Sequence, residues 1–365
     1  MRVKDGPTEV VITGGPCAGK TTGLAYLAEK LRERGFRVFT TPEVSTTLTT
    51  GGLHNIGELQ LTDRQAYYAT QREFVLMQRD LRARFQGLAA CFPDERCVIL
   101  HDRAEMDTAS YLTGKEWRAL CRELQLDAAE IRDSYDAVIH MVTVARDAPE
   151  LYNLESNPAR QELDAAAAVA ADEATLAAWI GHPRLRIIDN SSDFSTKLNR
   201  VLRVVLDALG EPELVRCRRF LLAEAPRSHP ALARARAVES EQVYLTSVDP
   251  SREVRLRRRA EEGQTTYSRV ERRITPGLEY EHEEGISAVE YARLLLSRDT
   301  SRQALRKTRY HFPYGSTYCR LDIFADDDPS AGLVMLSVDE LAGEPAELPP
   351  FAIERELEED FVLQT

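Results

Sequence analysis

The stretch from Val10 to Thr22 constrains this chain more than any other. An apolar, β-branched run leads into the pattern Gly14-x-x-x-x-Gly19-Lys20-Thr21, and a helix is expected from Thr21 to Arg34. In such a P-loop the glycines let successive backbone N–H groups turn toward a polyphosphate, and the lysine places a positive charge near the β- and γ-phosphates. The dipole of the following helix favours the same anion. The motif therefore predicts a nucleotide site. The expected contacts are Gly14, Gly15, Pro16, Cys17, Ala18, Gly19, Lys20, Thr21 and Thr22.

Composition limits the class of protein. A chain of 365 residues predicts two domains, and 43% hydrophobic with 29% charged residues is typical of globular domains. No run of about 18 apolar residues and no signal-peptide pattern occurs, so a cytoplasmic protein without a transmembrane segment is expected. The six scattered cysteines are expected to stay thiols. The net charge of -12 argues against nucleic-acid binding, yet arginines crowd between Arg252 and Arg320 and leave room for a local anion site.

The first two hundred residues read as alternating strands and helices. A buried parallel strand is expected at Cys97–Arg103, and its end would deliver a carboxylate beside the P-loop. Asp102 is therefore the predicted Mg2+-side acid together with the Thr21 hydroxyl, the alternative being a helix cap. Lys20 and Asp102 are assigned to catalysis, and Arg103 to a phosphate or acceptor contact. Glu43, in a segment expected to be a loop, is left open between an acceptor-side group and a solvated acid.

Further elements complete this α/β pattern. Strands are expected at 37–41, 137–144 and 182–190, and helices at 62–85, 161–180 and 194–209. The segment from Arg146 to Arg160 reads as a loop, where a kinase-like protein has its lid. Arg160 is a candidate to reach the transferred phosphate, the alternative being a solvated arginine. Asp189 and Asn190 close a strand where a nucleotide base commonly lies.

The pattern changes after Gly210-Glu-Pro212, so the predicted domains are 1–210 and 211–365. The second part is β-rich, with charged residues alternating along its strands. A charged solvated sheet face is one explanation, and a barrel with a charged interior that surrounds a phosphate group is the other. The bases predicted to line such a tunnel are Arg219, Arg255, Arg257, Arg269, Arg273, Lys307, Arg309 and Arg320.

These residues carry a resemblance. Residues 10 to about 209 resemble the NadR-like P-loop kinase domain through the P-loop, Asp102-Arg103 and the run from Ala178 to Asn190. Residues from about 213 resemble the CYTH, or triphosphate tunnel, superfamily through segments such as 253–257 and 307–309. The fusion is similar to the TRP translocation-defect protein family. That resemblance implies guanine-nucleotide binding, with GTP favoured over ATP, and an anionic lipid or phosphate ligand.

The chain departs from the tunnel pattern at one strand. Tunnel enzymes begin with Glu-x-Glu-x-Lys, whose acids hold the catalytic metal, and the matching stretch here is Val215-Arg-Cys217-Arg-Arg219. Neither Val215 nor Cys217 supplies the hard oxygen that Mg2+ prefers. The tunnel is therefore interpreted as a binding domain, coupled to slow nucleotide hydrolysis by the P-loop domain. The alternatives are a small-molecule kinase acting on a nucleoside or ribosyl pyridine, and a triphosphate tunnel phosphohydrolase.

Overall fold

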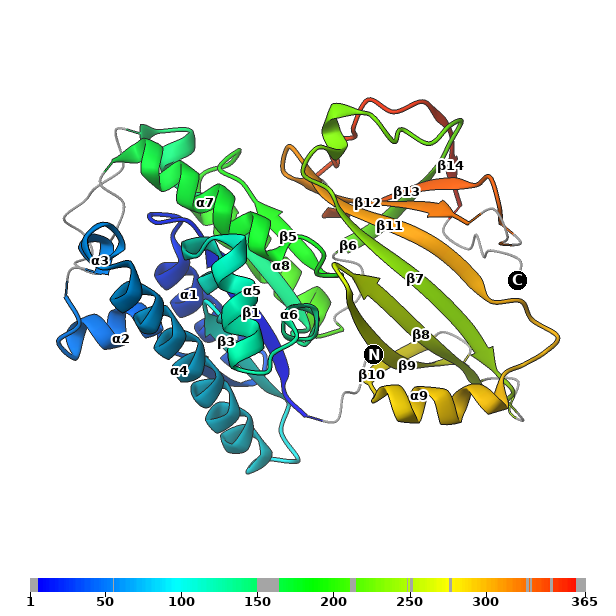
Figure 1. Ribbon diagram of the computed structural model, residues 1–365, viewed down its shortest axis with the longest axis horizontal. Helices are drawn as coiled ribbons and strands as arrows, with labels where there is room; N and C mark the ends of the chain where they lie inside the picture. The colour runs from blue at the N-terminus through cyan, green and yellow to red at the C-terminus, as the bar shows by residue number, and fades with distance from the viewer. Residues whose placement is uncertain are drawn as a thin grey trace. The chain divides into compact units, whose positions relative to one another are not determined.

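The computed structural model describes residues 6–54, 56–149, 164–210, 215–247, 249, 252–275, 278–325, 328, 330–341 and 344–358. Within these ranges, Val215, residues 273–275 and residues 278–282 are described by their backbone alone. The chain divides into two compact units, Asp5–Ala208 and Leu209–Thr365 (Figure 1). In the part of the chain that is described, no helix has the length and apolar character needed to span a bilayer.

The first unit is a parallel β-sheet covered by helices on both faces. The strands lie in the order β2-β3-β1-β4-β5 and every pair is parallel. Contacts place α1 and α8 together on one face, and α4, η1 and α7 on the other (Figure 1). Its strands are β1 (Thr8–Gly14), β2 (Arg37–Thr41), β3 (Cys97–Asp102), β4 (Ala137–Met141) and β5 (Leu185–Ile188). The buried, near-continuous apolar runs in β1, β3 and β4 are what a parallel sheet with two covered faces requires.

Each predicted helix of this unit has a counterpart in the structure, and the described residues hold four further α-helices that were not predicted. The helices are α1 (Lys20–Arg32), α2 (Val44–Thr50), α3 (Ile56–Thr62), α4 (Arg64–Ala90), α5 (Gly114–Glu123), α6 (Ala128–Asp133), α7 (Ala165–Trp179) and α8 (Phe194–Ala208), with 3-10 helices η1 (Glu105–Tyr111) and η2 (Val144–Arg146). The expectation of a plain loop after β2 is wrong, because α2 follows Glu43 directly. Its threonines have low helix propensity, but two of their hydroxyls bond back to carbonyls four residues earlier.

The second unit is built on one large antiparallel sheet. Its strand order is β10-β9-β8-β7-β11-β12-β13-β6-β14, so β10 and β14 are the edges of the sheet in the described residues. Its elements are β6 (Val215–Leu222), η5 (Pro230–Leu232), β7 (Arg236–Leu245), β8 (Arg252–Glu261), β9 (Gln264–Thr275), β10 (Leu278–Gly285), α9 (Ala288–Leu294), η6 (Leu295–Ser297), β11 (Leu305–Tyr314), β12 (Thr317–Phe324), β13 (Val334–Leu341) and β14 (Ile353–Leu357). The predicted fold class, an α/β P-loop unit followed by a β-rich unit, is confirmed.

The two faces of this sheet differ in chemistry. On one face Phe220, Phe312, Leu321 and Leu336 pack into an apolar core that Phe351 covers. Strand alternation places charged side chains on the other face, which we call the charged face. Apolar packing on one face therefore fixes which side chains the charged face presents.

Candidate functional site

The P-loop joins the end of β1 to the start of α1. Gly14 has a φ of 134°, and a Cβ there would lie 2.0 Å from the Met141 carbonyl oxygen, so only glycine fits. Gly19 caps α1 with a φ of 90° and supplies no side-chain hydrogen bond, and the first turn of α1 holds no acid. The N-terminal N–H groups of this 13-residue helix thus have neither a side-chain cap nor an acidic neighbour on their own turn. Such an end favours an anion.

Lys20 lies across this loop. Its Nζ donates to the carbonyl oxygens of Gly14 and Gly15, at 3.0 and 2.7 Å. Burial and the nearby charge of Arg103 lower the pKa of Lys20 to about 8, while Glu43 and Asp102 oppose this shift. The ammonium group of Lys20 therefore lies against the P-loop backbone, within electrostatic range of the Glu43 and Asp102 carboxylates.

Asp102 ends β3 beside β1, paired with Ile12, as the strand-end argument predicted. Its Oδ1 atom is buried and has no hydrogen-bond partner. Burial raises the pKa of Asp102 to about 6, and the charge of Glu43 adds to the rise. A buried carboxylate oxygen without a partner is costly unless a ligand satisfies it. The donor set at this point therefore suits a hard cation, with Thr21 at the start of α1 as the second oxygen donor.

Arg103 follows Asp102 in a left-handed conformation, with a φ of 66°. For a residue other than glycine this conformation costs energy and often marks a functional site. The Arg103 N–H donates to the Ile12 carbonyl, and its guanidinium donates to Glu43 at 3.1 Å and to Asp107 at 3.5 Å. The side chain is thus fixed among acids near Lys20, where the sequence analysis expected a phosphate or acceptor contact.

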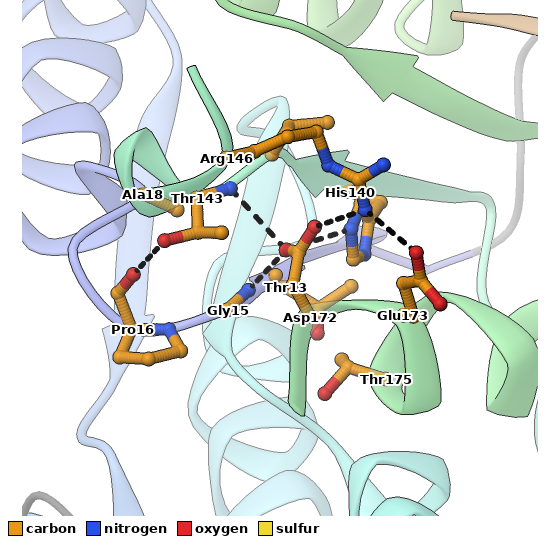
Figure 2. Close-up of polar contacts among 12 residues, drawn as sticks. Thr13, Gly15, Pro16, Ala18, His140, Thr143, Arg146, Asp172, Glu173 and Thr175 are labelled. Carbon is orange, nitrogen blue, oxygen red and sulfur yellow. Dashed lines mark hydrogen bonds and ion pairs between the residues drawn. The ribbon is translucent and has the colours of Figure 1, made fainter. Parts of the chain in front are cut away.

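A buried carboxylate, that of Asp172, contacts the backbone of the P-loop (Figure 2). Asp172 of α7 accepts a hydrogen bond from the Gly15 N–H at 2.8 Å and lies 3.1 Å from His140 Nε2. Thr143, after β4, donates its hydroxyl to the Pro16 carbonyl at 2.5 Å and its N–H to Asp172 at 3.3 Å. Burial opposes ionisation of Asp172, but the adjacent His140 imidazole and the bond from the Gly15 N–H outweigh it and lower its pKa. Gly15 and Pro16 of the loop are therefore held by Asp172 of α7 and by Thr143, which follows β4.

Lys197 of α8 holds the loop from the other side. Its buried Nζ donates to the carbonyl oxygens of Ala18 and Val142 and, at 2.6 Å, to Asn190 Oδ1. Asn190 in turn donates to Asp147 at 2.8 Å. Through Lys197, these bonds link Asn190, which was predicted to lie near the nucleotide base, to the P-loop. Asp189, the other residue predicted near the base, accepts a hydrogen bond from the Arg200 guanidinium at 2.6 Å.

The charged face of the second unit is sheltered from solvent. Only 14% of the Arg255 side chain and 17% of the Arg257 side chain are exposed, and Asp322 is 1% exposed. A freely solvated face would leave such side chains open, as Arg306 on the opposite face is at 51%. The sheltered position therefore disfavours the solvated-face explanation.

Ion pairs organise this face. Asp322 accepts from Lys307 at 2.7 Å and from Arg309 at 2.6 and 2.7 Å. Asp339 accepts two bonds from Arg320, at 2.5 and 2.8 Å. Across β6 to β13, nine basic side chains on this face accompany five acidic ones among those that the structure describes. Among the side chains that the structure describes, the face thus has more basic than acidic groups.

One part of the predicted tunnel set is wrong. Register pairs Leu256 with Arg269 and Arg252 with Arg273, so both positions of β9 lie on the face opposite Arg255 and Arg257. The arginine of β9 that does lie on the charged face is Arg272, because it is paired with Glu253, which shares that face with Arg255 and Arg257. The positions of Arg219, Arg255, Arg257, Lys307, Arg309 and Arg320 do share the charged face.

The family comparison decides the nature of the first unit. A family model described as an AAA domain matches residues 9–197, which is more than half of the chain. The chain belongs to this AAA-domain family. A P-loop NTPase-like domain that binds nucleotide is therefore established for its N-terminal part. The comparison with curated proteins gave no significant match.

Solved structures match part of this AAA-domain protein. Two structures of NE1496, one described as an inorganic triphosphatase and one as a hypothetical protein, are 26% and 27% identical, with TM-scores of 0.30 and 0.29. Each covers 40% of this chain and, respectively, 87% and 90% of its own. The PH1819 protein from Pyrococcus horikoshii OT3 is 13% identical, has a TM-score of 0.27, and covers 35% of this chain and 77% of its own.

The structure thus gathers Lys20, Asp102 and Arg103 in one place, while Arg160 lies outside the described residues. Sequence reasoning missed Asp172 and Lys197. A signal existed for the first, because Asp172-Glu173 interrupts an otherwise almost wholly apolar helix. A lysine in α8 gave no comparable signal, since the burial of its ammonium group depends on chain far from it in the sequence.

Proposed function

We propose that residues 1–210 bind a purine nucleoside triphosphate with Mg2+ and hydrolyse it slowly. The observation that carries the proposal is Lys20 at the uncapped start of α1 together with the nearby Asp102, whose buried Oδ1 has no hydrogen-bond partner. Thr21 and Asp102 would hold the cation, which when bound neutralises charge on the β- and γ-phosphates. The preference for GTP over ATP is supported by the family resemblance described above.

The residues of this chain divide the work around the phosphates. Backbone N–H groups of the loop and α1 would bind the phosphate oxygens, and Lys20 would counter the charge that builds on them. Asp172 and Lys197 keep the loop in shape by holding Gly15 and Ala18. This arrangement preorganises the donors before the anion arrives, which lowers the cost of ordering them.

The role of Asp102 as a Mg2+ ligand is tested by measuring how far Mg2+ tightens nucleotide binding. In Asp102→Asn, Mg2+ should no longer tighten nucleotide binding, a loss of about tenfold or 1.4 kcal/mol, because the amide lacks the charge. Calorimetry of GTP and ATP with Mg2+ and with a chelator measures this. Asp94→Asn, an exposed acid before β3, is the control. Unchanged Mg2+ dependence in Asp102→Asn would contradict the assignment, and phosphate release by the unaltered chain tests hydrolysis separately.

We propose that residues 211–365 bind a phosphorylated anion, or an anionic lipid head group, without hydrolysing it. The sheltered positive excess on the charged face supports binding, since enclosed arginines favour a compensating phosphate. NE1496 is described as an inorganic triphosphatase, yet Asp322 and Asp339 here are held by cations rather than free for a metal. Cys217 also stands where tunnel enzymes have an acid, and it accepts from Arg320 at 3.4 Å.

Removing two of these arginines tests the anion site. In the double variant Arg255→Ala with Arg257→Ala, tripolyphosphate should bind about 20-fold more weakly, since each lost arginine removes charge-assisted bonds. Arg258→Ala, on the opposite face of the same strand, should bind as the unaltered chain does. Nucleotide affinity should stay unchanged in both. Equal tripolyphosphate affinity in all three proteins would refute the site. Metal-dependent tripolyphosphate hydrolysis by a Lys20→Ala chain would refute its non-hydrolytic character.

A kinase that transfers the phosphoryl group to a small molecule is the second candidate function. The observation that favours it is a second carboxylate, Glu43, close to Lys20 and Asp102. A screen of nucleosides and ribosyl pyridines with labelled GTP and ATP distinguishes the two functions. Stoichiometric transfer to one of these acceptors would place the kinase ahead of the hydrolase.

A further inference from the structure

Glu43 occupies a distinctive place at the carboxyl edge of the parallel sheet. It follows β2 by one residue, Pro42, and the neighbouring strand β3 ends at Asp102. Register pairs Thr41 with His101, so the ends of the two strands are level. Glu43 therefore stands beside Asp102 and Arg103 although about sixty residues separate them in the chain.

Hydrogen bonds hold the Glu43 carboxylate in one orientation. Its Oε1 accepts from Arg103 Nε at 3.1 Å, and its Oε2 accepts from Thr46 Oγ1 at 2.5 Å. Arg103 is itself tied to Asp107, which accepts from the Thr13 hydroxyl and the Ala104 N–H. Only 19% of the Glu43 side chain is exposed. A solvated loop acid would not be fixed in this way, so that alternative loses its support.

The charges around Glu43 keep it an acceptor. Burial works against its ionisation, but Arg103 and Lys20 outweigh this and lower the pKa of Glu43. An ionised carboxylate can accept a hydrogen bond from an O–H group and then take its proton. Lys20 marks where the terminal phosphates of a bound nucleotide lie. The carboxylate thus stands near the end of the nucleotide at which a nucleophile attacks.

We infer that Glu43 accepts a hydrogen bond from the O–H of the nucleophile that attacks the γ-phosphorus. This rests on the proposed nucleotide function of the P-loop unit. The new bond joins the nucleophile oxygen to phosphorus, and the bond from phosphorus to the bridging β,γ oxygen breaks. Its electron pair leaves on the nucleoside diphosphate, and the proton passes to Glu43. The same O–H chemistry is offered by water in hydrolysis and by an alcohol in transfer.

The test compares Glu43→Gln with Glu58→Gln, an exposed glutamate in α3 of the same unit. Turnover of γ-labelled GTP and ATP is measured in two arms, as inorganic phosphate in buffer alone and as labelled ester with ribonucleosides present. Glu43→Gln should lower the rate about 100-fold in whichever arm is active, because the amide cannot take the proton. Nucleotide affinity should stay within about threefold, and Glu58→Gln should match the unaltered chain.

Two phosphate analogues separate this role from a structural one. Nucleoside diphosphate with AlF4− mimics the state in which the nucleophile attacks, whereas BeF3− mimics the state before attack. Glu43→Gln should weaken the AlF4− complex about tenfold and leave the BeF3− complex unchanged. Equal weakening of both complexes, or turnover within threefold of the unaltered chain, would overturn the inference. Failure of the unaltered chain to bind nucleotide would instead overturn the proposed function itself.

Discussion

Lys20→Ala should abolish measurable nucleotide binding by the P-loop unit. We expect affinity for GTP and for ATP to fall at least about 1000-fold, or about 4 kcal/mol, in calorimetry. The ammonium group is the basic side chain of the loop itself, and it sits where burial strengthens each bond to a phosphate oxygen. Losing it also leaves the polyphosphate next to Glu43 and Asp102, whose charges repel it.

Lys30→Ala is the matched control for this change. Lys30 belongs to the same helix, and its pair with Glu33 at 2.9 Å lies on the surface. Its removal should leave nucleotide affinity unaltered, since exposed pairs contribute little. Both tryptophans, Trp117 and Trp179, lie in the P-loop unit, so their fluorescence reports whether Lys20→Ala keeps this unit folded. A folded Lys20→Ala chain that binds GTP and ATP normally would remove the basis of the nucleotide assignment.

Those parts of the site that one contiguous stretch encodes were predictable. The glycines, lysine and threonine of the P-loop lie within eight consecutive positions, and Asp102 follows an apolar run that predicts a buried strand. Asp172 and Lys197 act on the loop from 157 and 179 residues away. Such contacts depend on how α7 and α8 pack on the sheet, which local periodicity does not encode.

The face of the sheet on which Arg269 and Arg273 of β9 lie was predicted wrongly for a different reason. Period-two alternation identifies which residues of one strand share a face, but not how that face matches the next strand. The turn at Glu262 and Gly263, with φ of 47° and 83°, pairs Glu261 with Gln264 and so fixes the register. A two-residue turn ending in glycine was therefore a signal that would have placed Arg269 opposite Leu256.

Asp322→Asn should destabilise the β-rich unit by about 3–5 kcal/mol. Asp322 is 1% exposed and accepts three bonds from Lys307 and Arg309. Burial disfavours its ionisation, but these two cations outweigh burial and lower the pKa of Asp322. The amide keeps the shape and loses the charge, so two sheltered cations are left facing one another. Circular dichroism of the sheet during urea unfolding measures the loss, while tryptophan fluorescence of the P-loop unit should not shift.

Glu241→Gln is the control, because Glu241 pairs with Arg306, which is half exposed on the opposite face, and its loss should cost less than about 1 kcal/mol.

Unfolding of the unaltered chain at low pH tests the Asp322 carboxyl in a second way. A carboxyl with a lowered pKa contributes stability that is present above its usual pKa of about 4 and is lost as the pH falls below it. Asp322→Asn should lack this part of the acid sensitivity, and tripolyphosphate should restore part of its lost stability by binding Lys307 and Arg309. A variant as stable as the unaltered chain, or one that tripolyphosphate does not stabilise, would show that the charged face tolerates its cations without a compensating anion.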